Sequence, residues 1–141
     1  MTPARLSNLK EASPAIRVAI VRGPETTVLA DSLEKLLAEA KGFTFSRLEY
    51  RDQSGLKPKA ASSGNADVVV ATLSAFQATD LELFFASLQR AFPHCPVLVT
   101  TTHPDAFDVF PVLEMGASDF LLPPLRRSEV LPRLMRQARV F

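Results

Sequence analysis

The chain has 141 residues, of which 47% are hydrophobic, and its charged side chains leave a formal net charge of +1. This length suits one domain with an ordinary core, and the near-neutral charge provides no global field toward nucleic acid or membrane surfaces. No apolar run approaches the roughly 20 residues that a membrane-spanning helix needs. The single cysteine, Cys95, excludes an internal disulfide. With no targeting segment in sight, we expect a cytoplasmic protein.

The first half of the chain alternates apolar runs with amphipathic stretches. Residues 1–15 are polar and predict a flexible lead-in, and Ile16–Val21 is an apolar run of strand length. Apolar residues then recur with helical spacing over residues 29–40, and Gly42 is expected to end that helix. The partly alternating stretch Phe43–Tyr50 predicts an edge strand that is exposed on one side.

The middle of the chain contains its least regular stretch. Residues 51–65 are rich in Ser, Gly and Pro, and they predict at best a short helix around Lys59–Ser62. A parallel sheet normally needs a crossover helix there. Val68–Ala71 predicts a buried third strand. In the helix that follows, Thr79 and Glu82 fit a capping box, and an apolar stripe comes after them.

The last third of the chain repeats the strand–helix pattern twice. Val97–Thr101 predicts the fourth strand. The helix expected over residues 105–115 contains Pro111, so it is either kinked there or begins only near Asp108. Gly116 is expected to end it.

The final elements complete an alternating pattern. Phe120–Leu122 predicts the last strand, and Ser128 is expected to cap a last helix that carries Pro132 in its first turn. Alternation of this kind predicts a doubly wound α/β domain over residues 16–141. In it a five-stranded parallel sheet lies between two helix layers, and the second crossover helix is short or missing.

Four segments of this chain are spaced as in a known family: Ile16–Val21, Asp67–Thr72, Pro96–Thr102 and Gly116–Pro124. Together they resemble the receiver domain of two-component response regulators. The resemblance covers residues 16–141 and implies a flavodoxin-like fold. In open α/β sheets of this kind, functional sites lie at the carboxyl ends of the strands.

The resemblance also assigns roles to positions. In receivers an acidic pair after the first strand helps to hold Mg²⁺, and an Asp ending the third strand accepts the phosphoryl group. A Ser or Thr ends the fourth strand, an aromatic switch residue lies on the fifth, and a Lys precedes a cis-proline. The matching residues here are, in the same order, Arg22 and Gly23, Thr72, Thr101, Phe120, Pro123 and Pro124.

These residues lack the chemistry of the family. Phosphoryl transfer needs a carboxylate nucleophile, a hard cation held by oxygen ligands and a cationic side chain for the developing charge. Thr72 would need an activating base, and Arg22 would repel Mg²⁺. The resemblance therefore implies a pseudo-receiver with no catalytic activity, metal or cofactor. Arg22 either binds an anion at this edge or, more simply, points to solvent or pairs with Glu25 or Asp67.

Basic residues gather near the carboxyl end of the chain. Receivers use the fourth helix, last strand and last helix as a surface for dimerisation or docking, and Arg is favoured at interfaces. We expect a protein partner or a second copy of the chain to bind here, although a merely solvated face stays open and nucleic-acid binding is not expected. The residues expected on this surface are Phe120, Arg126, Arg127, Arg133 and Arg136.

The leading hypothesis is a phosphorylation-independent module for protein interaction or dimerisation in bacterial signalling or transcription control. It is open whether the chain acts alone or as the amino-terminal module of a longer regulator with an output domain. Atypical receivers of similar appearance precede transcription activators that use the alternative sigma factor, and the ATPase of some pilus-assembly localisation proteins. Two alternatives remain: a receiver with non-standard phosphoacceptor chemistry at Thr72, and a small-ligand-binding flavodoxin-like module.

Overall fold

The computed structural model describes residues 15–52, 55–56, 66–74, 78–103 and 109–139. The strands are β1 (Ile16–Arg22), β2 (Phe43–Asp52), β3 (Gly55–Leu56), β4 (Val68–Leu73), β5 (Val97–Thr101) and β6 (Asp119–Leu121). The helices are α2 (Thr27–Ala38), α3 (Ala78–Ala91), α4 (Val109–Glu114) and α5 (Arg127–Arg139). The predicted lead-in lies outside the described residues apart from Ala15.

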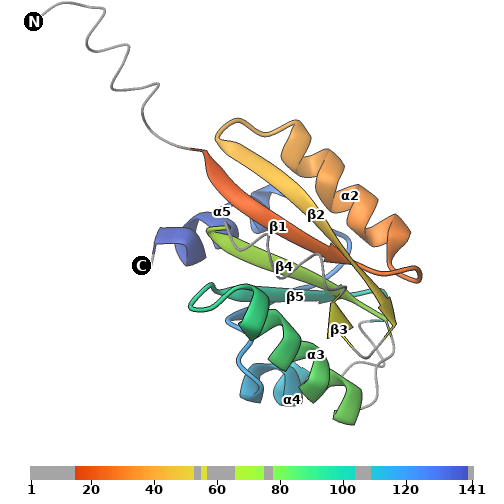
Figure 1. Ribbon diagram of the computed structural model, residues 1–141. Helices are drawn as coiled ribbons and strands as arrows, with labels where there is room; N and C mark the ends of the chain where they lie inside the picture. Colours follow the sequence, from red (N-terminus) through yellow and green to blue (C-terminus); the bar gives the residue numbers. More distant parts are fainter. Residues whose placement is uncertain (1–14, 53–54, 57–65, 75–77, 104–108, 140–141) are drawn as a thin grey trace, which may run out of the picture.

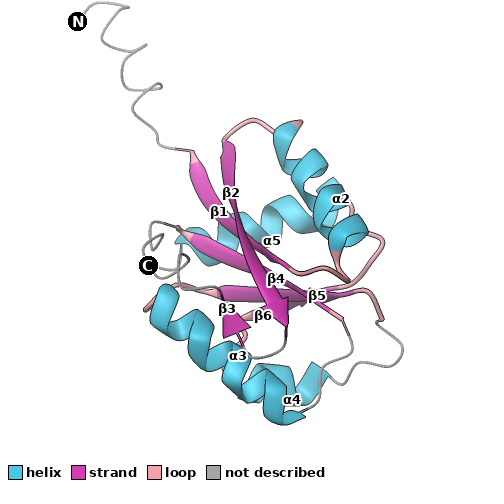
Figure 2. Ribbon diagram, turned by 45° about the vertical axis from the view of Figure 1, so that its right-hand side comes forward, coloured by secondary structure: helices cyan, strands magenta, loops and turns pink. Residues whose placement is uncertain are grey.

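The strands form one sheet in the order β3-β2-β1-β4-β5-β6, with helices on both faces (Figures 1 and 2). The five predicted strands run parallel, and β3 is antiparallel to β2. This arrangement confirms the predicted doubly wound, three-layer α/β fold. None of the described helices is long and apolar enough to cross a membrane.

Side chains of successive strand residues enter two separate cores, because they point to opposite faces of the sheet. On β1, Val18 and Ile20 pack under α2 and α5, whereas Ala19 and Val21 pack under α3 and α4. Every residue of β4 is buried, as expected of a central parallel strand. The two layers therefore fix the carboxyl ends of β1, β4 and β5 side by side.

Strand β2 confirms the predicted strand and extends it to Asp52, but the edge of the sheet is formed by β3, which pairs with the last residues of β2. Strand β2 pairs with β1 from Phe43 to Glu49, whereas its pairing with β3 begins only at Tyr50. Strand β3 was not predicted, because two residues carry too little pattern to be recognised. Between β2 and β4 the described residues contain no helix, and the predicted short helix at Lys59–Ser62 lies outside them.

Two predicted helix caps are wrong. Helix α3 begins at Ala78, ahead of the expected cap Thr79. Helix α5 begins at Arg127, and the carbonyl of Arg126 accepts the first helical N–H groups, so Ser128 lies within the helix. Because the helix starts early, Pro132 falls inside it rather than in its first turn.

The predictions for α4 and for the last strand can also be compared with the structure. Helix α4 is described from Val109 to Glu114 and contains Pro111, and residues 105–108 of the predicted helix lie outside the described residues. The last strand is one residue earlier than predicted, because its pairing with β5 runs from Asp119 to Leu121. Leu122 is therefore left 58% exposed, just ahead of a cis peptide bond between Pro123 and Pro124.

Candidate functional site

The carboxyl edge of the sheet brings together most of the positions expected from the sequence. Arg22 ends β1 and Thr101 ends β5, while Thr72 lies one residue before the end of β4. Pro123 follows β6 at the same edge. Thr72 and Thr101 are fully buried, so neither hydroxyl is open to a substrate from solvent.

The hydroxyl of Thr72 belongs to a closed hydrogen-bond network. Its Oγ1 atom lies 2.7 Å from the carbonyl oxygen of Val21 and 2.8 Å from Oγ1 of Thr26. The Val21 carbonyl can only accept, so Thr72 donates its one proton there. Thr26 is also fully buried, and its hydroxyl accepts the N–H of Gly23 over 2.9 Å. Neither contact of Thr72 is a base that could activate it as a nucleophile.

Tyr50 of β2 covers this network. Its hydroxyl donates to the carbonyl oxygen of Thr72 over 2.7 Å, and only 4% of the residue is exposed. Burial raises the pKa of Tyr50 to about 12. The ring also packs edge-on against Phe84 of α3, with centroids 5.1 Å apart.

The ring of Tyr50 fills the space beside the loop after β1. A Cβ atom at Gly23 would lie 2.2 Å from Cε2 of Tyr50, which is too close for any side chain other than hydrogen. Residue 23 matches one of the family's acidic positions, and Tyr50 now occupies the room that an acid there would need. In the sequence, Gly23 itself was the only sign of the contact with Tyr50, since a glycine leaves room for a neighbouring ring.

Arg22 points toward α2, which corrects the expectation that it faces solvent or pairs with Glu25 or Asp67. Its guanidinium nitrogens lie 2.5 Å from Oε2 of Glu34 and 2.6 Å from Oδ1 of Asp31. The Glu34 side chain is 7% exposed. A cation paired in this way is not free to bind an anion at the sheet edge.

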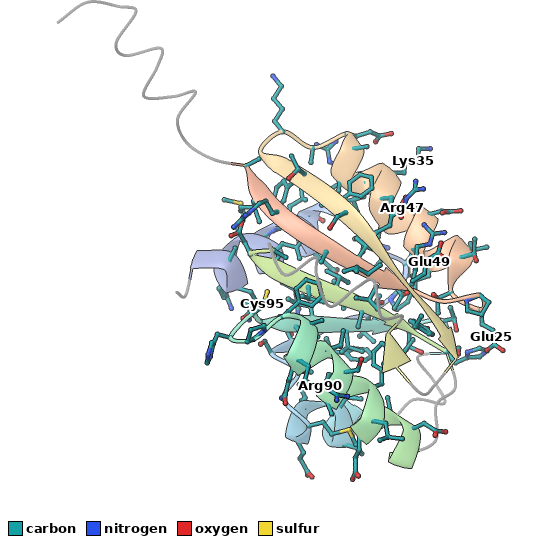
Figure 3. All side chains as sticks on the ribbon, viewed as in Figure 1. Glu25, Lys35, Arg47, Glu49, Arg90 and Cys95 are labelled. Atoms are coloured by element: carbon teal, nitrogen blue, oxygen red, sulfur yellow. The ribbon has the colours of Figure 1, made fainter. Side chains whose placement is uncertain are left out.

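Glu34 also binds a second arginine. Its Oε1 atom accepts from the guanidinium of Arg47, an exposed side chain of β2 that lies alongside α2 in Figure 3. Glu34 therefore joins β1, β2 and α2 through two cations. Sequence analysis missed it, because a single Glu on an apolar helix face reads as a solvated residue.

The other expected partner of Arg22, Asp67, lies at the amino end of β4. It accepts two bonds from the Arg17 guanidinium and one from the Arg17 backbone N–H. The Arg17 side-chain hydrogen bond lowers the pKa of the Asp67 carboxyl. This pair is separate from the carboxyl edge and has no part in the candidate site.

The two threonines that end β5, Thr100 and Thr101, are both buried. Oγ1 of Thr101 accepts the N–H of His103 over 3.2 Å. The Thr100 hydroxyl is buried and has no hydrogen-bond partner among the described residues. Among all the residues that the structure describes, no group of three or more His, Cys, Asp or Glu side chains could hold a metal ion.

The residues expected on the interaction surface are only partly free. Phe120 is half-buried and packs against the core under α3 and α4. Arg133 binds both carboxylate oxygens of Asp119, at 3.0 and 3.1 Å, and the carbonyl of Phe120. Arg126, Arg127 and Arg136 are exposed.

Comparisons with known proteins agree with this architecture. No family model and no curated protein sequence matches the chain. Solved structures do match, among them a pilus assembly-related protein from Burkholderia pseudomallei, with 20% identity, a TM-score of 0.66 and coverage of 87% of this chain and 89% of that one.

Two receivers show the same likeness. The signal receiver domain of NarL from Mycobacterium tuberculosis has 19% identity and a TM-score of 0.63, and the match covers 89% of this chain and 98% of that one. For the chemotaxis protein CheY4 from Vibrio cholerae the identity is 19% and the TM-score 0.64, over 87% of this chain and 98% of that one. The chain has the fold of response-regulator receiver domains.

Proposed function

We propose that this domain is a pseudo-receiver: a cytoplasmic regulatory module of signalling that works through protein contact and not through phosphoryl transfer. The observation that carries the proposal is the state of Thr72, at the position of the family's phosphoacceptor. Its hydroxyl is buried and donates to a backbone carbonyl. A group without a base or solvent access is poorly suited to attack a phosphodonor.

The other positions of the site support the same proposal. Arg22 stands where receivers place a metal-binding acid, and it is paired with Glu34 and Asp31 of α2. Pro123 stands in place of the Lys and has no charge to offer a phosphoryl group. Among the residues that the structure describes, these positions therefore supply neither the anionic pocket that attracts Mg²⁺ nor the cation that would stabilise a bound phosphoryl oxygen.

The setting of such a module is a protein assembly. The Burkholderia neighbour is described as pilus assembly-related, and the NarL neighbour is the receiver of a response regulator. We infer that the domain docks onto a protein partner, an output domain or a second copy of itself. The exposed arginines of α5 are the surface that we assign to this contact.

Phosphodonor labelling tests the proposal directly. The protein is incubated with acetyl phosphate and Mg²⁺ and examined by intact mass spectrometry, beside a receiver that has the usual Asp. We expect the control receiver to gain one phosphoryl group and this protein to gain none. A stable, Mg²⁺-dependent label that disappears in Thr72→Ala would overturn the proposal in favour of altered acceptor chemistry.

A further inference from the structure

The outer edge of β2 is open over most of its length. Strand β2 has ten residues, but its outer neighbour β3 pairs with it only at Tyr50 and Asp52, near the end of the strand (Figure 1). From Phe43 to Leu48, no strand among the described residues lies on the outer side of β2. The backbone groups that point to that side are therefore available for pairing with another strand.

This edge lacks the usual protection against a second strand. Proteins commonly protect an edge strand with proline, lysine, a β-bulge or a very short length. Residues 43–49 contain neither Pro nor Lys, and they pair with β1 without a break in register. The irregularity of β2 lies further along, between Tyr50 and Asp52. The stretch is therefore long and regular enough to accept a strand.

The side chains of this stretch are only partly covered within one copy of the chain. Phe43 and Phe45 point to the α2 side of the sheet, where they pack at the margin of the core and stay half-buried. Thr44 and Ser46 point to the other side, because strand residues alternate, and both are exposed. A strand alongside β2 would complete the burial of both aromatic rings.

Pairing of β2 with β2 of a second copy is restricted to few registers. Two copies related by a two-fold axis use the same surface, and their strands run antiparallel. Residues that face each other in an antiparallel ladder point to the same side of the sheet, so the axis lies at a residue and not between two. The position of the axis then decides how many residues pair.

An axis at Phe45 satisfies the constraints best. It pairs residues 43–47 of both copies and leaves Leu48 and Glu49 between the second strand and β3. An axis one residue later would place the start of the second strand directly beside β3. An axis one residue earlier would shorten the ladder to residues 43–45.

In this register each cross-strand pair is of a favourable type. Phe45 faces Phe45 of the second copy, and Thr44 faces Ser46, with which it can share a hydrogen bond. Phe43 faces Arg47, whose guanidinium can lie over the ring. The charge of Arg47 is already balanced by Glu34 of α2. The strand is thus complementary to itself, which favours a second copy over an unrelated segment.

Helix α2 fits the same arrangement. It packs over both β1 and β2, so its axis lies roughly half a strand spacing inside β2. With strands about 4.8 Å apart, two copies of α2 would lie about 10 Å apart across the two-fold axis, a distance at which helices pack. Ala38 is exposed and lies one turn beyond Glu34, on the side of α2 nearest Arg47. Its small side chain permits this approach.

We propose that two copies of this chain associate through the outer edges of β2, antiparallel and around a two-fold axis at Phe45. The two sheets then become one continuous sheet. Strand β6 lies at the other end of the strand order, so both copies keep the surface of α5 for a partner protein. The inference goes beyond the proposed function, because it assigns a second contact surface to the domain.

Sedimentation of the 141-residue chain over a wide concentration range tests the inference. We expect a monomer–dimer equilibrium. The double variant Thr44→Lys/Ser46→Lys places lysine against lysine in two cross-strand pairs, and we expect it to weaken self-association about tenfold or more. Both substituted side chains are exposed, so the fold of the single copy is retained.

The charge-matched variant tests the register. In Thr44→Lys/Ser46→Glu, the introduced lysine of one copy faces the introduced glutamate of the other, so we expect the dimer to be retained. A control on the other face of the sheet is Ala86→Lys/Gln89→Lys, at two exposed positions of α3, which should leave self-association unchanged. Circular dichroism and thermal melting confirm that each variant is folded.

Three results would overturn the inference. One is a monomer at every concentration, and another is a dimer that Thr44→Lys/Ser46→Lys retains, which would lie on a different surface such as that of α5. The third is an equal loss of the dimer in both charge variants, which would exclude the register. In each case the proposed function stands, because labelling with acetyl phosphate tests it separately.

Discussion

The ring of Tyr50 fills the space beside Gly23 at the carboxyl edge of the sheet, where receivers have their phosphorylation site. The Tyr50 ring is held in place by its bond to the Thr72 carbonyl and by Phe84, so it cannot move aside without loss of both contacts. We expect Gly23→Ala to lower the free energy of unfolding by about 1–3 kcal/mol, the usual range for an overpacked site. Urea denaturation measures this. A variant as stable as the wild type would contradict the close contact.

Tyr50 is the one tyrosine of the chain, which makes its ionisation directly visible in ultraviolet absorbance. We expect the folded protein to titrate near pH 12, against about 10 for an exposed phenol. Because the pKa of Tyr50 is higher in the folded state, the contribution of its protonated form to stability is fully present below about pH 10. This contribution is lost as the pH rises toward 12. A folded-state midpoint near pH 10 would show that Tyr50 is exposed.

Residue spacing located some of this site and missed the rest. The pattern of strands placed Arg22, Thr72 and Thr101 at one edge, because strand ends are visible as the limits of apolar runs. Tyr50 lies 22 residues from its hydrogen-bond acceptor, and Arg22 lies 12 residues from Glu34. Such pairings depend on how elements pack, and no local pattern reports them.

At the scale of elements, Glu34 fastens α2 to the two strands beneath it. The carboxylate accepts from both Arg22 and Arg47 and is almost fully buried. We expect Glu34→Ala to cost about 3–5 kcal/mol of stability, because it leaves the nearly buried Arg22 without its main partner. Asp31→Ala is the matched control: Asp31 binds the same Arg22 but is 60% exposed, and its loss should cost about 1 kcal/mol or less.

Equal losses of stability in the two α2 variants would mean that burial of Glu34 is not what matters. Thermal or urea unfolding of both variants in the same buffer makes the comparison. Added salt sharpens it, because screening weakens an exposed ion pair more than a buried one.

The pair of Arg17 and Asp67 joins the amino ends of β1 and β4 and introduces a pH dependence. The pKa of Asp67 is lower in the folded state, so its contribution to stability is present above the ordinary value near 4 and is lost as the pH falls further. We expect Asp67→Asn to be less stable at neutral pH and to lose less on acidification from pH 5 to 2. The free energy of unfolding of both proteins is measured at each pH. An equal loss for the two proteins between pH 5 and pH 2 would contradict this.

Element boundaries were predictable where local chemistry is strong. Gly116 takes a positive φ of 115° just beyond α4, as the sequence indicated, whereas α2 ends at Ala38, four residues before the Gly42 that was expected to end it. The caps at Thr79 and Ser128 were misplaced, because Ser and Thr are common both at caps and within the first turn. The structure places both helix starts slightly earlier than these residues.

For the whole molecule, the alternation of strands and helices was sufficient to predict the fold class. Right-handed crossovers leave few ways to arrange five parallel strands, and the observed order of these strands is one of them. Function was less accessible, since a fold supports many functions and the neighbours are at most distantly similar in sequence. The proposed function therefore depends on the buried Thr72 network at the carboxyl edge of the sheet and on the surface of α5.

The most direct test of that argument is an NMR titration of the ¹⁵N-labelled protein with Mg²⁺ and then beryllofluoride, which imitates a phosphoryl group on a receiver. The account predicts no saturable shifts of the amides of Gly23, Thr26, Thr72 and Thr101, because the buried hydroxyl network leaves no site for either ion. Saturable shifts at these amides, spreading to β6 and α5, would contradict it and show a working phosphorylation site.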